Sequence, residues 1–202
     1  MDRTSAPGPD ELGPSFYRAA WPTIQPAMLR LFDAVHARHA QLGAINRAHV
    51  VLLPKAEGVL SPSSFRPVSL QNCSVKTVCK TLTSRLQAQI GSLADENQSG
   101  FLSGRSISET FVFATELVQC CFKRKTPTLV RKLDFSKAFD SIDWLSLRTI
   151  MRARGFPEQW CDWMDMILYT SRSAILLNGM MGPWIDCKRG LRQGDPLFPT
   201  SS

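Results

Sequence analysis

The chain has 202 residues, the size of one domain or of one domain with a helical extension. Hydrophobic residues make up 44% of it and charged residues 20%, a globular composition that argues against wholesale disorder. Lys and Arg number 24 against 17 Asp and Glu; the formal charge of +7 is compatible with a polyanionic partner but does not establish one. No stretch has the ~18 apolar residues of a membrane span, and the N-terminal residues lack the apolar core of a secretory signal.

The cysteine and histidine patterns argue against a disulfide framework and against a zinc site. The six cysteines form no C-x-x-C pair, and most of them fall within apolar helical patterns. The three histidines do not pair with cysteines at zinc-ligand spacing. We therefore expect buried free thiols and an intracellular protein, in the nucleus or the cytoplasm.

Hydrophobic periodicity and chain-breaking residues predict the elements of the N-terminal half. Residues 16–39 are expected to form two short helices or one kinked helix, with Pro26 in a first turn. The apolar run at 47–53 predicts a strand, and two X-Pro breaks indicate a loop at 55–67. Residues 74–90 carry apolar side chains at helical spacing, which predicts a strong helix.

The next segment is expected to hold a buried helix and a strand. Residues 106–109 have the pattern of a capping box, and the apolar stripe after it predicts a buried helical face. The members of that stripe are Ile107, Phe111, Ala114, Leu117, Val118, Cys121 and Phe122. Residues 128–133 predict a strand that runs directly into Asp134.

Two helices and a hairpin are expected in the last third of the chain. The helices span 144–154, with Asp143 as N-cap, and 158–169, opened by Pro157. Residues 172–177 and 184–188 predict a β-hairpin whose loop, around Asn178 and Gly179, is longer than two residues. The predicted fold class is α+β with few strands.

Three sites are candidates for chemistry when the residues are taken one at a time. Asp134, at the end of a strand, could hold a hard cation such as Mg²⁺, but capping of the following turn is the commoner role of such a residue, and a metal site needs a second anionic ligand. The loop GLRQGDPL at 190–197 could bind phosphate or base edges, or be an ordinary loop-to-helix junction. Lys55 and Arg66 flank a loop, where most cations are merely solvated.

Four blocks in order resemble one family. LLPKAEGVLSPSSFRPVSLQN, NQSGFLSGRSISE, KLDFSKAFDSIDW and LNGMMGPWIDCKRGLRQGDPL closely resemble the reverse transcriptases of non-LTR (LINE-type) retrotransposons, and the resemblance covers residues 9–199. It implies an RNA-directed DNA polymerase that copies an RNA template from a DNA primer, using deoxynucleoside triphosphates and two Mg²⁺ ions. It also implies the fingers and partial palm of a right-hand polymerase, without a membrane partner.

The resemblance assigns roles residue by residue. Asp134 matches the first catalytic, metal-binding carboxylate of the palm, and Phe139 the aromatic residue under the incoming sugar. The residues that match the grip on the triphosphate and on the incoming nucleotide are Lys55, Arg66, Gln193 and Gly194. The template-binding block runs from 98 to 106 and includes Gln98, Gly100, Gly104 and Arg105.

The sequence departs from the family at the second metal-binding motif. Members carry an aromatic-x-Asp-Asp turn after RQGDPL, and this chain has no adjacent Asp pair. We expect a truncated, inactive member with a helical extension (1–45), a fingers-like region (46–125) and a partial palm (126–202), without a thumb. The alternative is a non-catalytic, basic, nucleic-acid-binding remnant; a generic basic domain is the third reading.

Overall fold

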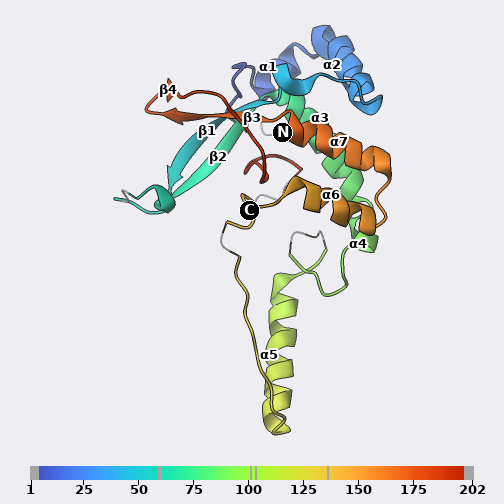
Figure 1. Ribbon diagram of the computed structural model, residues 1–202, viewed down its shortest axis with the longest axis vertical. Coiled ribbons are helices and arrows are strands. Elements are labelled where there is room, and N and C mark those ends of the chain that lie inside the picture. Colours follow the sequence, from blue (N-terminus) through green and yellow to red (C-terminus); the bar gives the residue numbers. More distant parts are fainter. Residues whose placement is uncertain (1–4, 59–60, 101, 103, 136, 198–202) are drawn as a thin grey trace.

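A mixed sheet and a group of packed helices make up the body of the molecule (Figure 1). The computed structural model describes residues 5–58, 61–100, 102, 104–135 and 137–197. The helices are α1 (Pro14–Ala19), α2 (Trp21–His36), α3 (Cys73–Gln87), α4 (Ile90–Leu93), α5 (Ile107–Lys123), α6 (Trp144–Ala153) and α7 (Glu158–Tyr169). The strands are β1 (Arg47–Pro54), β2 (Phe65–Gln71), β3 (Arg172–Leu177), β4 (Met180–Met181) and β5 (Ile185–Asp186).

The sheet joins residues that are far apart in the sequence. Its strand order is β2-β1-β3-β4, with β5 also paired to β3. β1 is antiparallel to β2 and parallel to β3, with Arg47 opposite Arg172 and Val51 opposite both Val68 and Leu176. One sheet therefore combines strands from the expected fingers and from the expected palm, so that the division between these regions stays a prediction.

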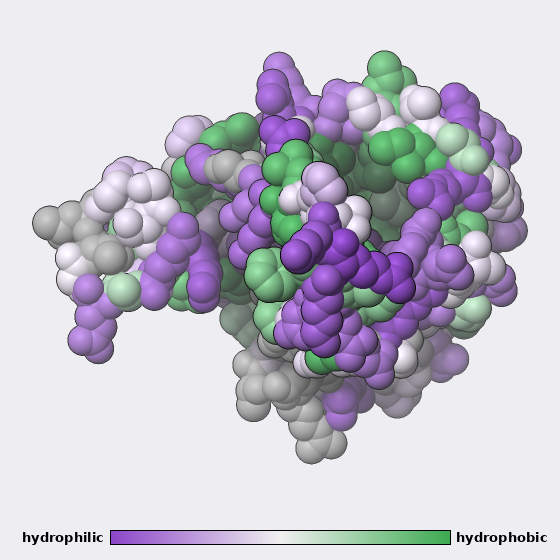
Figure 2. All heavy atoms as spheres, turned by 90° about the horizontal axis from the view of Figure 1, so that it is seen from below, coloured by the Kyte–Doolittle hydropathy of each residue, from purple (hydrophilic) through white to green (hydrophobic). Residues whose placement is uncertain are grey.

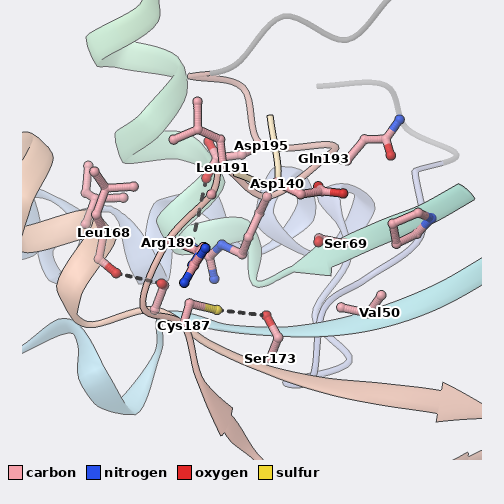
Figure 3. A pocket seen from close by; sticks show the side chains of 15 residues that line it. Val50, Ser69, Asp140, Leu168, Ser173, Cys187, Arg189, Leu191, Gln193 and Asp195 are labelled. Atoms are coloured by element: carbon pink, nitrogen blue, oxygen red, sulfur yellow. Dashed lines mark hydrogen bonds and ion pairs between the residues drawn. The ribbon is translucent and has the colours of Figure 1, made fainter. Parts of the chain in front are cut away.

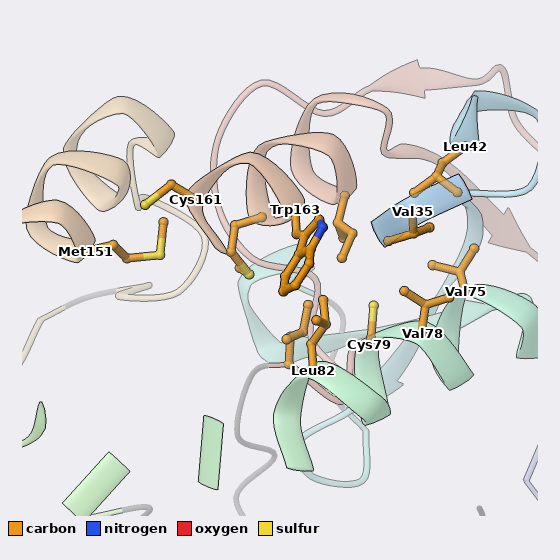
Figure 4. Packing of buried hydrophobic residues seen from close by; sticks show 12 residues of the cluster. Val35, Leu42, Val75, Val78, Cys79, Leu82, Met151, Cys161 and Trp163 are labelled. Carbon is orange, nitrogen blue, oxygen red and sulfur yellow. The ribbon is translucent and has the colours of Figure 1, made fainter. Parts of the chain in front are cut away.

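The hydrophobic core lies among α2, α3, α6 and α7 (Figure 4). The stripe predicted for α3 supplies Val75, Val78, Cys79 and Leu82, all at most 5% exposed. Opposite it, α7 contributes Cys161, Trp163, Met164 and Ile167. These helices are amphipathic, so one face of each is withdrawn from water when they pack together.

Most predicted helices are confirmed, with shifted ends. Asp143 caps α6 as expected, because its carboxylate accepts a 2.8 Å hydrogen bond from the Ser146 N–H. The N-terminal region forms two helices, but Pro22 is in the first turn of α2 and Pro26 lies inside it. The prediction for Pro26 was therefore wrong: the helix tolerates the loss of one N–H donor there.

The hairpin at β3 and β4 has a tighter loop than the sequence suggested. Leu177 pairs with Met180, so only Asn178 and Gly179 connect the strands. Both have positive φ, 50° and 77°, as a type I′ turn requires. The predicted pairing of 172–177 with 184–188 is confirmed at β3 and β5, but the connection between them contains β4, which pairs with β3 directly after the two-residue turn.

The strand predicted at 128–133 is absent from these residues, all of which the structure describes. The segment runs back from the end of α5 toward the body of the molecule (Figure 1). Leu129, Val130 and Leu133 are 91%, 66% and 66% exposed. A β-strand needs a neighbouring backbone for its hydrogen bonds, and none of the described strands pairs with this segment.

Helix α5 forms where predicted, but its apolar face is exposed. None of its residues is buried, and Phe111 and Phe122 are 73% and 85% exposed. In Figure 1 it extends away from the other helices, and the view from below shows hydrophobic surface open between hydrophilic residues (Figure 2). Ser106 begins the helix without a side-chain capping bond. The expected burial was wrong because no described element packs on this face.

The thiols are free, although fewer are buried than expected. Cys73, Cys79 and Cys161 are buried, whereas Cys120 on α5 is exposed for the same reason as its neighbours. Among the described residues no helix combines the length and the apolar character needed to cross a membrane.

Candidate functional site

The loop containing Gln193 and Gly194 is fixed to the outer edge of β2. The Ser69 N–H, which points away from β1, donates a 2.9 Å hydrogen bond to the carbonyl of Gln193. Gly194 has a φ of +98°, and a Cβ there would lie 3.2 Å from the Ser69 carbonyl oxygen. A side chain would disturb this close approach, so the glycine lets the loop reach the strand.

A buried carboxylate fixes the other side of the same loop. Asp195 is 1% exposed and accepts hydrogen bonds from the Gln71 side-chain amide at 2.8 Å and from the Leu197 N–H at 3.0 Å. Its neighbour Arg192 lies 3.8 Å from the carboxylate and also bonds the side chain of Asn46. Burial, with Asp195 beside it, raises the pKa of the Cys79 thiol well above its ordinary value.

The segment after Asp134 meets this loop from the opposite side. The Leu191 N–H donates to the carbonyl of Phe139 at 2.9 Å, and the Gly190 N–H to that of Ile142 at 2.7 Å. Gly190 has a φ of +75°, and a Cβ on it would come within 2.5 Å of the Asp140 carbonyl oxygen. Two blocks that are about fifty residues apart are therefore held in direct backbone contact.

These contacts surround a cavity of about 180 Å³ (Figure 3). Two arginines, Arg189 and Arg192, and two carboxylates, Asp140 and Asp195, contribute to its lining. Val50 and Ser69 line it from the sheet, while Gln193 is exposed at its rim. Cations next to exposed polar groups suit a phosphorylated ligand, because a planar guanidinium can donate two hydrogen bonds to one phosphate.

Lys55 and Arg66 lie together at the far end of the β1–β2 hairpin. Arg66 pairs with Leu53, two residues before Lys55, and the Lys55 ammonium donates to the Ser63 carbonyl at 2.8 Å. Both side chains are exposed. Three residues, or roughly 10 Å, separate Arg66 from Ser69 along the strand, and this odd spacing places their side chains on opposite faces of the sheet. The structure thus brings these two cations together but separates them from the cavity.

The described residues do not fit a two-metal site. Asp134 is exposed in the extended segment that precedes the contacts of Phe139. No group of three or more His, Cys, Asp or Glu residues in the described part of the chain could hold a metal ion. A divalent cation needs several oxygen ligands held in place, and a single carboxylate on an unpaired segment does not supply them.

In the described part of the predicted template-binding block, Arg105 bonds to backbone carbonyls of residues that precede it in the chain. Arg105 donates from one guanidinium nitrogen to the carbonyls of Asp95, Glu96 and Gln98, at 2.5, 3.2 and 2.6 Å. The Gln98 side chain bonds the carbonyl of Gly100, and Gly104 has a φ of +80°. Arg105 therefore orders its own loop, and contact of this block with a template stays a prediction.

Sequence reasoning missed Asp140, Arg189 and Asp195 as residues around the cavity. Asp140 lies three residues before Asp143, the N-cap of α6. The available signal was the motif RGLRQGD at 189–195, whose first and last residues, Arg189 and Asp195, both line the cavity. Their contribution depends on contacts with β2 and with the segment at 139–142, which no local pattern displays.

Comparison with known proteins identifies the class. The family model described as reverse transcriptase (RNA-dependent DNA polymerase) matches residues 53–202, and the chain belongs to this family. The resemblance to the enzymes of non-LTR retrotransposons is confirmed. The mixed helix and sheet structure agrees with this family, whose members generally use Mg²⁺, a nucleic-acid template and deoxynucleotides.

Curated relatives are much longer than this chain. It is 25% identical over 197 residues to the Retrovirus-related Pol polyprotein from type-1 retrotransposable element R2 of Nasonia vitripennis, with 98% of this chain and 19% of the relative covered. It is 28% identical to the type-2 element R2DM polyprotein of Drosophila melanogaster (97% and 18% covered) and 26% to the Transposon TX1 uncharacterized 149 kDa protein of Xenopus laevis (98% and 15%). The chain is thus a reverse transcriptase domain fragment relative to these proteins, spanning under a fifth of each.

Proposed function

We propose that this chain is the nucleotide-contacting and template-contacting portion of an RNA-directed DNA polymerase, and that the 202 residues alone bind nucleic acid without extending a primer. The observation that carries the first part is the docking of Gln193 and Gly194 on Ser69, next to Arg189 and Arg192. It presents an exposed amide side chain beside two cations, which suits an incoming nucleotide.

The other roles in this proposal come from the family resemblance. Lys55 and Arg66 would grip the triphosphate, Phe139 would lie under the sugar, and Asp134 would be the catalytic carboxylate. Gln98, Gly100, Gly104 and Arg105 would contact the template. The exposed position of Lys55 and Arg66 leaves both cations accessible to phosphate.

The second part of the proposal, that the chain alone does not extend a primer, rests on the carboxylates available to hold metal ions. Phosphoryl transfer depends on positioning and on charge neutralisation by metals, and misplacing the reacting groups by about 1 Å can already cost ~10²-fold in rate. Among the described residues, Asp134 belongs to no group of three or more His, Cys, Asp or Glu residues that could hold a metal ion. The alternative function, a non-catalytic nucleic-acid-binding protein, is favoured by the same observation together with the charge of +7.

Primer extension on an RNA template, with Mg²⁺ or Mn²⁺, tests the proposal beside a filter-binding salt titration. We expect no extension, and binding that weakens steeply with salt because Lys and Arg contact phosphates. Asp134→Ala should leave binding unchanged or slightly stronger. Asp33→Ala, which removes the same charge from the exposed face of α2, is the control. Extension that depends on Asp134 would refute the inactive state, and binding insensitive to salt would refute the binding function.

A further inference from the structure

One face of the sheet carries an aromatic and cationic cluster, and of its members only Arg66 has a role in the proposed nucleotide site. Paired residues on neighbouring strands project to the same face, and successive residues alternate. The register therefore places Arg47, His49, Arg66 and Arg172 on one face. Val50 and Ser69, which line the cavity, project from the other. The cluster is thus on the far side of the sheet from that cavity.

Trp184 lies flat over two of these side chains. Its ring stacks on the His49 ring with centroids 5.8 Å apart and planes 22° apart, and the Arg47 guanidinium carbon is 5.3 Å from the Trp184 centroid. Pairing of Ile185 with Ser173 places the neighbouring Trp184 beside Ala174, which is fully buried. The indole is half-buried, so part of it remains open to solvent.

Packing alone is a poor explanation for the side chains beneath this indole. The Nε of Arg47 and the Nε2 of His49 are buried and have no hydrogen-bond partner among the described residues. Buried polar atoms without partners cost free energy that apolar side chains would avoid. In the described part of the chain the Nε of Arg172 also lacks a hydrogen bond, but it lies 2.6 Å from a carboxylate oxygen of Asp186, so the charge of this arginine is balanced.

Within the described parts of the chain, the arginines of this face that form no ion pair lie at its two ends. Arg47 begins β1, and Arg66 is opposite Leu53, six residues or roughly 20 Å further along that strand. Half-buried apolar residues such as Val51, Val68 and Leu70 lie between them. Cations that track a backbone, combined with an aromatic ring on which a base can stack, are the arrangement that binds single-stranded nucleic acid without regard to sequence.

We infer that this sheet face binds a single-stranded nucleic-acid segment, with a base stacked on Trp184 and phosphates on Arg47 and Arg66. The charge of the face is complementary to a polyanion, and the indole offers a surface that any base can use. This inference rests on the proposed function in one respect, that the ligand of the chain is nucleic acid. It adds a second contact surface, on the face of the sheet opposite the cavity.

Binding of two probes tests the inference. The probes are a labelled 12-nucleotide single strand, as RNA and as DNA, and a blunt RNA–DNA duplex without unpaired bases. Trp184→Ala should weaken single-strand binding about tenfold and affect the duplex much less, because only the single strand presents unstacked bases. Trp184→Phe should stay within about threefold of the parent chain. Arg47→Ala should reduce the salt slope by about 1, and Arg47→Lys should preserve it.

Trp21→Ala, which removes an exposed indole from α2, is the matched control and should change neither affinity. If Trp184→Ala unfolds the chain, the folded variant Trp184→Phe tests the inference instead. The fluorescence quenching that poly(U) causes in the parent chain should be largely lost in Trp184→Phe, because the stacked indole is gone. Unchanged quenching in Trp184→Phe, or unchanged single-strand affinity in folded Trp184→Ala, would overturn the inference. Either result would leave duplex binding intact, and with it the proposed function. A parent chain that binds only the duplex would also overturn it, and one that binds neither probe would overturn both.

Discussion

The side-chain amide of Gln71 donates a 2.8 Å hydrogen bond to the carboxylate of Asp195, and both residues are at most 1% exposed. The bond joins the last residue of β2 to the loop of Gln193 across 124 positions of sequence. Together with the contact of Ser69 on the Gln193 carbonyl, it fixes that loop to the sheet at two points.

We expect Asp195→Ala to lower the free energy of unfolding by about 1–3 kcal/mol, because Gln71 and the Leu197 N–H would be left buried without an acceptor. Asp195→Asn, which keeps the shape and one acceptor oxygen, should lose less. Urea denaturation of the two variants measures the difference. Equal losses for Ala and Asn would show that the hydrogen bonds to this side chain contribute little.

Gly190→Ala should separate the loop from the segment that follows Asp134. The new methyl group would meet the Asp140 carbonyl oxygen at 2.5 Å, and a φ of +75° is unfavourable for alanine. We expect a loss of at least about 1 kcal/mol in thermal or urea unfolding. Gly43→Ala, with nothing within 4 Å of the added carbon and no positive φ, is the control. A loss no larger than that of the control would contradict this close contact.

The ion-pair cluster between α6 and α7 should make stability depend on pH in the acid range. Hydrogen bonds from Arg148 and Arg38 hold the pKa of Asp162 below its ordinary value of 3.8. Hydrogen bonds from Arg152 and Arg148 hold the pKa of Glu158 below 4.5. A depressed carboxyl pKa stabilises the folded state above the pKa of the unfolded chain, and this stabilisation is lost as the pH falls through the folded pKa.

The melting temperature should therefore fall as the pH is lowered from about 5 toward 3, and less steeply in Arg148→Met. The difference between parent and variant should shrink toward the acid end. Arg30→Met, at an exposed position of α2, serves as the control and should follow the parent curve. Parallel curves for Arg148→Met and the parent would exclude this cluster as the source.

The apolar face of α5 is exposed in the structure, whereas the sequence pattern predicted that it is buried, and a substitution on this face distinguishes the two. Phe111→Ala should change the free energy of unfolding by no more than about 0.5 kcal/mol, because the side chain is 73% exposed. A buried phenylalanine would cost about 3–5 kcal/mol. Leu82→Ala, at a residue 5% exposed in α3, should cost about 2–5 kcal/mol in the same urea titration. A large loss at Phe111 would mean that a surface covers this face in solution.

Local signals predicted the helices well. The ends of α7 match the predicted 158–169, because Pro157 and the spacing of apolar residues act within one or two turns. The cap of Asp143 on α6 is equally local. The family was also readable from the sequence, since four blocks in order are more specific than any single motif.

The same local signals failed where an element needs a neighbour. Residues 128–133 and the apolar stripe of α5 have the composition of a strand and of a buried helix, yet they are exposed. Periodicity shows which side chains could be buried, but burial requires a second surface, and none of the described elements provides it. The two-residue turn at Asn178 and Gly179 was obscured because β4 and β5 divide one return path into two short strands.

For the candidate site, too, some features follow from local sequence and others from tertiary contacts. The sequence by itself determined the family and the motif residues Gln193 and Gly194, because the motif is a continuous stretch of chain. Only the tertiary structure decided that Asp195 anchors this loop to Gln71, that Asp140 reaches the same cavity, and that Trp184 covers Arg47 on the other face of the sheet. These relationships depend on strand register and on backbone contacts between distant segments, which have no counterpart in local residue spacing.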